Sequence, residues 1–135
     1  MPVPGLLPDV SLTIGGHMVR ARALSGTLLV LIPPACQCAA MLKWLTGISA
    51  QAGAPTYLVG TPKTIREVRH LYNRLPATLA ARAEVAYDAN SVLQDRYGAA
   101  AHGLTAILVR PNQHVDTDHL TVPGGGASLI QALTD

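Results

Sequence analysis

The sequence contains no phenylalanine and a single tryptophan, and only 13% of its 135 residues are charged. Disordered chains are highly charged and poor in apolar residues, whereas 49% of these residues are hydrophobic, so the composition predicts a folded domain. Because large aromatic side chains are so scarce, the core must be built from Leu, Val, Ile and Ala. The length is sufficient for one ordinary hydrophobic core without disulfide or metal staples.

The sequence also lacks a strong charge of either sign. Ten Lys and Arg residues against eight Asp and Glu residues give a net charge of +2. This small net charge, together with the absence of a Phe/Tyr-rich base-stacking pattern, argues against a nucleic-acid partner. A near-neutral surface argues equally against electrostatic attachment to a membrane.

No apolar run approaches the roughly 18 residues that a membrane-spanning helix requires. The longest run, Thr27 to Ile32, has the length of a β-strand. The first nine residues show no basic segment followed by an apolar stretch, so we expect no signal peptide there. We therefore predict no membrane insertion within this chain, and leave open an anchor or export signal upstream in a longer protein.

Hydrophobic periodicity and turn residues predict alternating strands and helices. The expected strands are residues 10–14, 17–21, 27–32, 55–60, 83–87, 104–110 and 114–122. The expected helices are residues 35–51, 61–73, a short segment that begins near 88 or 90 and ends at 97, and 127–133. This order predicts the α/β class, with a central mixed β-sheet flanked by helices and an N-terminal β-hairpin.

Local signals fix several ends of these elements. Gly15 and Gly16 form a typical hairpin turn, and Gly53 is expected to end the first long helix. Thr61 is predicted to cap the second helix, with a proline at the first helical position. Asp88 or Asn90 is predicted to cap the short helix that follows the strand at residues 83–87.

Two segments carry a family resemblance. The stretch LPDVSLTIGGHMVRARALSGTLLVLI has a Pro-Asp start, a glycine-containing hairpin and an apolar strand, and YDANSVLQDRYGAAAHGLTAILVRPNQHV has an Asp-led helix, an apolar strand and a Pro-Asn turn. Together they resemble the thioredoxin-like superfamily, in particular its TlpA/ResA-like and peroxiredoxin-like branch. The second stretch also resembles the C-terminal thioredoxin-like domain of flavin-dependent aromatic hydroxylases, which is usually described as structural.

The resemblance implies a thioredoxin-like fold in a single domain over residues 1–135, with residues 1–26 as a hairpin extension and 27–135 as the core. It implies protein thiols or small dithiols as partners, and no organic cofactor. By the same analogy the protein is expected to be extracytoplasmic, with a membrane anchor in the full-length protein, or otherwise cytoplasmic.

The two cysteines of the sequence, Cys36 and Cys38, stand in the segment PPACQC, directly after an apolar strand and at the start of a predicted helix. A helix N-terminus has a partial positive charge and unpaired N–H groups, which stabilise a thiolate. The resemblance to the thioredoxin-like superfamily implies that Cys36 stands where that family has its nucleophilic cysteine. The family motif is Cys-x-x-Cys, whereas this sequence has Cys-x-Cys. The leading hypothesis is thiol-disulfide exchange, with Cys36 as attacking thiolate and Cys38 as resolving thiol.

The resemblance also implies three substrate-binding positions: Pro34, Leu104 and Thr105. The family has a cis-proline followed by threonine just before its later strand, and Leu104 and Thr105 stand at that place here. Pro34 precedes the cysteine pair and would make the backbone that leads to Cys36 rigid.

Two other hypotheses remain open at this point. Two thiolates and a histidine suit Cu(I), and the segment that begins at His102 resembles that of Sco-type copper proteins, although those use Cys-x-x-x-Cys. The metal site would then be Cys36, Cys38 and His102; otherwise no metal is expected. Alternatively, both cysteines are small buried residues in a thioredoxin-fold structural or interaction module without catalytic chemistry.

Overall fold

The computed structural model describes residues 10–33, 39–97, 104–110 and 115–120. Its strands are β1 (Ser11–Ile14), β2 (His17–Arg20), β3 (Thr27–Leu31), β4 (Thr56–Gly60), β5 (Ala83–Tyr87), β6 (Leu104–Val109) and β7 (Val115–Leu120). Its helices are α1 (Ala39–Gln51), α2 (Ile65–Asn73), α3 (Ala77–Ala80) and α4 (Val92–Tyr97), with a short 3₁₀ turn at Ala21–Ala23. The last predicted helix, residues 127–133, lies outside the described residues.

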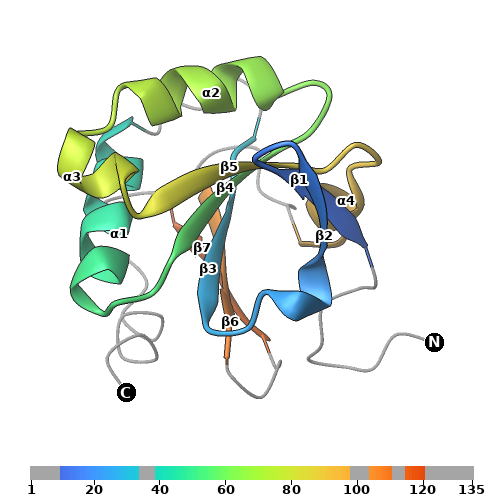
Figure 1. Cartoon of the computed structure of the whole chain (residues 1–135), viewed down its shortest axis with the longest axis horizontal. Helices are drawn as coiled ribbons and strands as arrows, with labels where there is room; N and C mark the ends of the chain where they lie inside the picture. Colours follow the sequence, from blue (N-terminus) through green and yellow to red (C-terminus); the bar gives the residue numbers. More distant parts are fainter. Residues whose placement is uncertain (1–9, 34–38, 98–103, 111–114, 121–135) are drawn as a thin grey trace.

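The seven described strands form one mixed sheet in the order β2-β1-β5-β4-β3-β6-β7. Strands β3, β4 and β5 run parallel, while β6 and β7 pair antiparallel beyond β3 (Figure 1). Parallel neighbours need crossover connections, and α1 and the α2–α3 segment supply them. The predicted α/β class, with its mixed sheet and flanking helices, is confirmed.

The predicted N-terminal hairpin is also confirmed. Gly15 and Gly16 have φ angles of 59° and 82°, the left-handed values that a tight two-residue hairpin turn requires. The hairpin joins the sheet at β5, where Thr13 pairs with Tyr87 and Ile14 with Ala86. Its attachment to the rest of the sheet therefore involves a strand distant in the sequence.

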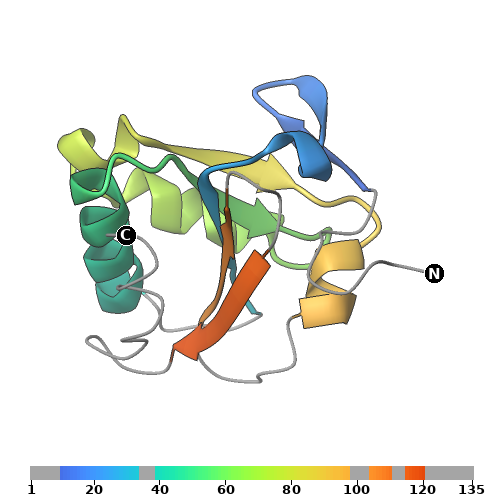
Figure 2. The ribbon, with the colours of Figure 1, turned by 90° about the horizontal axis from the view of Figure 1, so that it is seen from below.

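The core consists of two layers, one on each face of β3, whose five residues are all buried. Leu28 and Val30 belong to the layer formed with α1 and α2, which includes Leu42. Leu29 and Leu31 belong to the layer formed with the hairpin and α4. Because successive side chains of a strand point to opposite faces, the continuous apolar run fills both layers, and α4 lies across the sheet from α1 and α2 (Figure 2).

Helix ends follow the predictions in part. Gly53, with a φ of 76°, ends α1 as expected, and the N–H of Gly53 donates to the carbonyl of Ala50 at 3.1 Å. The capping role predicted for Thr61 is wrong, because α2 begins at Ile65. The hydroxyl oxygen of Thr64 instead accepts a hydrogen bond from the N–H of Thr61 at 2.9 Å, which closes a turn ahead of the helix.

Candidate functional site

The carboxyl ends of the three parallel strands share one edge of the sheet. Strands β3, β4 and β5 end at Leu31, Gly60 and Tyr87, and the parallel registers bring these ends together. In open α/β sheets, ligands bind outside the carboxyl ends of the strands. The chain continues from β3 through buried Ile32 and Pro33 toward the cysteine segment, so this edge is the candidate functional site.

Several predicted site residues lie outside the described part of the chain. These are Pro34, Cys36, Cys38 and His102. The described chain resumes at Ala39, the first residue of α1 and the residue directly after Cys38. The roles assigned to the cysteines, to Pro34 and to a copper ligand at His102 therefore stay predictions.

Leu104 and Thr105 begin strand β6, beside the end of β3. Thr105 pairs with Leu31, the last residue of β3, so the antiparallel register brings the start of β6 next to the chain that leads into the cysteine segment. Leu104 is 0% exposed and Thr105 is 3% exposed. Leu104 packs in the core layer of α1 and α2. Both residues are buried, and the substrate-binding role predicted for them stays a prediction.

Asp88 is a buried carboxylate at the same sheet edge, directly after β5. Its N–H donates to the carbonyl of Gly60 at 2.8 Å, which ties the end of β5 to the end of β4. Its Oδ2 accepts a hydrogen bond from the N–H of Leu93 at 2.8 Å, so Asp88 rather than Asn90 caps α4. The side chain is 0% exposed, and Oδ1 has no hydrogen-bond partner within the described residues. The sequence predicted the cap but not the burial, which arises from the packing of α4 against the sheet.

A cationic groove opens where α1 begins. It has a volume of about 210 Å³ and lies between the first turns of α1 and the end of α2. The lining residues are Ala39, Ala40, Lys43, Leu71, Arg74, Leu75 and Pro76. Lys43 and Arg74 are exposed, and the lining contains no acidic side chain. Sequence reasoning missed this groove because it depends on how two helices pack.

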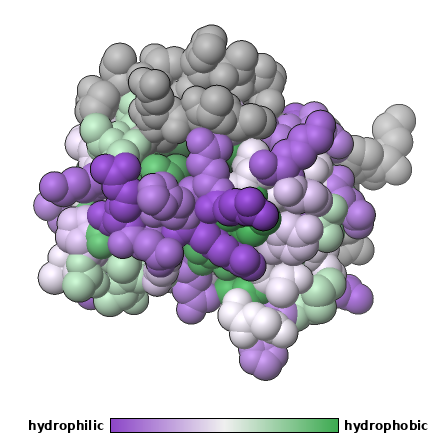
Figure 3. All heavy atoms as spheres, turned by 90° about the horizontal axis from the view of Figure 1, so that it is seen from above, coloured by the Kyte–Doolittle hydropathy of each residue, from purple (hydrophilic) through white to green (hydrophobic). Residues whose placement is uncertain are grey.

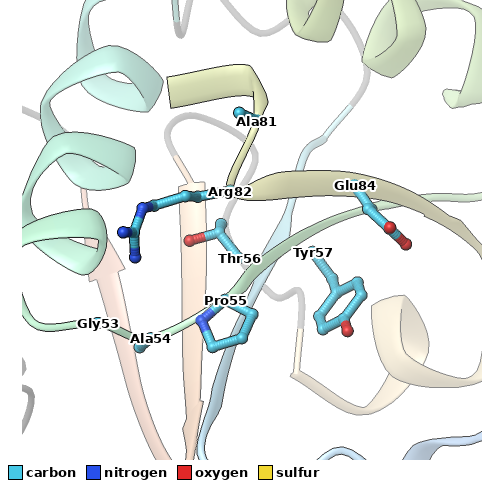
Figure 4. A pocket seen from close by; sticks show the side chains of 8 residues that line it. All are labelled: Gly53, Ala54, Pro55, Thr56, Tyr57, Ala81, Arg82 and Glu84. Carbon is cyan, nitrogen blue, oxygen red and sulfur yellow. The ribbon is translucent and has the colours of Figure 1, made fainter. Parts of the chain in front are cut away.

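A second pocket lies at the opposite edge of the sheet, at the amino ends of β4 and β5. It has a volume of about 240 Å³, and Arg82 and Glu84 point to opposite sides of it, with Pro55 and Tyr57 between them (Figure 4). Burial raises the pKa of Tyr57, and the neighbouring carboxylate of Glu84 raises it further. The parallel strands separate this pocket from the candidate site by their full length.

The described residues contain no group of three or more His, Cys, Asp and Glu side chains arranged to hold a metal ion. Over the same ranges, no helix has the length and apolar character needed to cross a membrane. These two findings concern the described residues alone.

Neither a protein-family model nor a curated protein sequence matches this chain. Solved structures do match it. A secreted disulfide oxidoreductase of Mycobacterium tuberculosis, homologous to E. coli DsbE, has a TM-score of 0.65 and 15% identity over 93% of this chain and 94% of its own. The fold is thioredoxin-like. This confirms the thioredoxin-like fold that the resemblance of the two sequence segments implies.

Other solved structures share this fold. The exposed lipoprotein thioredoxin of Streptococcus pneumoniae has a TM-score of 0.60 and 20% identity over 93% of this chain and 98% of its own. Peroxiredoxin Q of Xanthomonas campestris has a TM-score of 0.60 and 17% identity over 93% of this chain and 90% of its own. Identities this low establish the thioredoxin-like fold alone, so the chemistry has to be argued from the residues of this chain.

Proposed function

We propose that this chain is a thiol-disulfide exchange domain that acts on protein thiols, with Cys36 as the attacking thiolate and Cys38 as the resolving thiol. One observation carries the proposal. The cysteine segment joins the carboxyl end of β3, the fully buried central parallel strand, to the first residue of the 13-residue helix α1. In a thioredoxin-like fold this is the connection at which a helix N-terminus favours the thiolate over the thiol.

The reaction requires no external cofactor. The Cys36 thiolate attacks one sulfur of a substrate disulfide, which forms a mixed disulfide and releases the other substrate sulfur as a thiolate. The Cys38 thiolate then attacks the sulfur of Cys36, and the second substrate sulfur leaves. The substrate gains two electrons and the Cys36–Cys38 pair loses two, and the reverse sequence oxidises a substrate dithiol.

The one-residue spacing favours the oxidising direction. A disulfide closed across a single intervening residue forms a small, strained ring, which is more easily reduced than a relaxed disulfide. A strained, easily reduced disulfide oxidises a substrate dithiol and is itself reduced. We infer that the Cys36–Cys38 pair acts as an oxidant or isomerase rather than as a structural staple, in an extracytoplasmic protein.

Single-cysteine variants test the proposal. With 2-hydroxyethyl disulfide as a small uncharged substrate, the reduced protein is expected to transfer two electrons, and Cys36→Ser to abolish the transfer. Cys38→Ser is expected to accumulate a mixed disulfide on Cys36, detected as a mass increase that dithiothreitol reverses. Alkylation rates measured against pH are expected to show Cys36 ionising below about pH 8.

Two results would contradict the proposal. One is a Cys36 thiol that ionises only above about pH 9, as apolar burial would produce. The other is an absence of electron transfer in the reduced wild-type protein whose fold is intact by circular dichroism. Either result would favour the thioredoxin-fold module without chemistry.

A further inference from the structure

Basic residues are concentrated in the part of the chain that follows the cysteine segment. Residues 39–82 hold six of the ten Lys and Arg residues of the chain but one of its eight Asp and Glu residues. All six basic side chains are exposed. The surface seen from the side of α2 shows a broad band of hydrophilic side chains across these elements (Figure 3). A nearly neutral chain thus carries a local excess of positive charge in this segment.

The groove at the start of α1 is the pocket of this segment closest in sequence to the cysteines. Lys43, on α1, and Arg74, which directly follows α2, provide its two charges. Leu75 and Pro76, with the largely buried Leu71, provide the apolar part of its lining. A guanidinium pairs well with a carboxylate through two parallel N–H···O bonds, whereas an ammonium acts as a compact point charge. The groove therefore offers two anion contacts around an apolar centre.

We propose that this groove docks an acidic polypeptide segment of the thiol substrate, with carboxylates on Lys43 and Arg74 and an apolar side chain against Leu75 and Pro76. The apolar centre favours a polypeptide over inorganic phosphate, and the lining has no aromatic side chain on which a nucleic-acid base would stack. Complementary charge speeds the encounter of two proteins and fixes their orientation. The substrate class is thus acidic proteins that carry a disulfide or dithiol.

This inference rests on the proposed function, because the groove is assigned to substrate docking on the ground that the proposed dithiol directly precedes it in the sequence. Ala39 and Ala40, which line the groove, directly follow Cys38 in the sequence. The lining of the groove therefore begins at the residue that follows the proposed dithiol in the sequence. Docking itself needs no redox chemistry, so the two proposals can fail separately.

Binding is measured by fluorescence anisotropy with two labelled peptides that contain no cysteine. One alternates Glu and Leu, and the matched peptide has Lys in place of each Glu. The full chain is expected to bind the acidic peptide at least about tenfold more tightly at low ionic strength, and salt at about 0.15 M should reduce the difference.

Charge-reversal variants locate the contact. The double variant Lys43→Glu/Arg74→Glu is expected to weaken binding of the acidic peptide by about tenfold or more, because two favourable pairs become repulsive. Lys63→Glu is the matched control: Lys63 is also exposed, but it lies in the turn before α2 and outside the groove. We expect less than about a threefold change for this control. Circular dichroism verifies that all variants remain folded.

The outcomes separate the two proposals. Equal affinity for both peptides, or equal weakening by Lys63→Glu and by the double variant, would overturn the docking site. Exchange with 2-hydroxyethyl disulfide but no acidic-peptide preference would leave the dithiol function standing and refute the docking site. Peptide docking without any exchange would refute the dithiol function and leave an acidic-peptide binding module. A mixed-disulfide form of the acidic peptide should also react faster than its basic counterpart.

Discussion

Gly60 is the residue at which a single added methyl group should reveal how tightly α2 packs on the sheet. A Cβ atom at this position would lie 2.8 Å from Cδ1 of Ile65, 3.0 Å from Cα of Ile65 and 3.2 Å from Cγ2 of Val68. The first contact involves a movable side-chain end, but the second involves the backbone of α2. Gly60→Ala therefore requires α2 to move away from the end of β4.

Two opposing contributions set the change in the free energy of unfolding caused by Gly60→Ala. Forcing an extra carbon into a packed interior costs about 1–3 kcal/mol. Replacing glycine by alanine also restricts the unfolded chain, which returns about 0.4–1 kcal/mol. We expect a net loss of about 1–2 kcal/mol in the free energy of unfolding. The loss should be larger if α2 cannot move without breaking the hydrogen bond from the N–H of Asp88 to the carbonyl of Gly60.

Gly47→Ala is the matched control. Gly47 lies inside α1, and a Cβ atom built there has no neighbour within 4 Å. Alanine should therefore stabilise the protein by about 0.5–1 kcal/mol, because glycine is a poor residue in a helix interior. Urea unfolding followed by circular dichroism measures both variants, since a change in midpoint at constant slope reports stability. A Gly60→Ala protein as stable as wild type would refute the close packing of α2 on β4.

Three further perturbations test other parts of the structure. Leu42→Ala, at a fully buried position of α1, should cost about 2–5 kcal/mol in urea unfolding. Asp88→Asn keeps an acceptor for the N–H of Leu93 and should be more stable than Asp88→Ala by about 1 kcal/mol; equal stabilities would contradict the cap. The raised pKa of Tyr57 means that the folded state holds the phenol proton more tightly than the unfolded state. Stability should therefore be undiminished below pH 10, the ordinary pKa of tyrosine, and fall as the pH rises from there through the folded pKa. Glu84→Gln should lower that pKa part of the way, because burial is the larger cause, and tyrosinate absorbance compared with Tyr57→Phe measures it.

The elements that sequence predicted well are those whose signals are local and unopposed. The continuous apolar run at residues 27–32 can bury its side chains on both faces only if it lies between two core layers. Strand β3 lies there, and all five of its residues are buried. Gly15 and Gly16 provide the left-handed conformations of the hairpin turn. At Thr61 a competing interaction prevailed, because the hydroxyl of Thr64 reached back to the Thr61 N–H and delayed the helix.

The candidate site was predictable only in its sequence-encoded parts. A cysteine pair between an apolar strand and a helix is visible in the sequence, and so is an aspartate ahead of α4. The start of β6 lies next to the end of β3 because of the strand order in the sheet. The groove lined by Lys43 and Arg74 depends on how α1 packs beside α2. Such long-range contacts arise from packing, which residue spacing along the chain does not specify.

The attachment of the hairpin to β5 has a consequence for synthesis on the ribosome. Leu12 and Ile14 emerge early, but β5, which pairs with β1, is made about seventy residues later, which is roughly 4–15 s at 5–20 residues per second. An isolated two-stranded hairpin is at best marginally stable in water, so its apolar side chains stay available to other chains and to chaperones during that interval. The nascent chain should therefore be most prone to aggregation before Tyr87 leaves the ribosome.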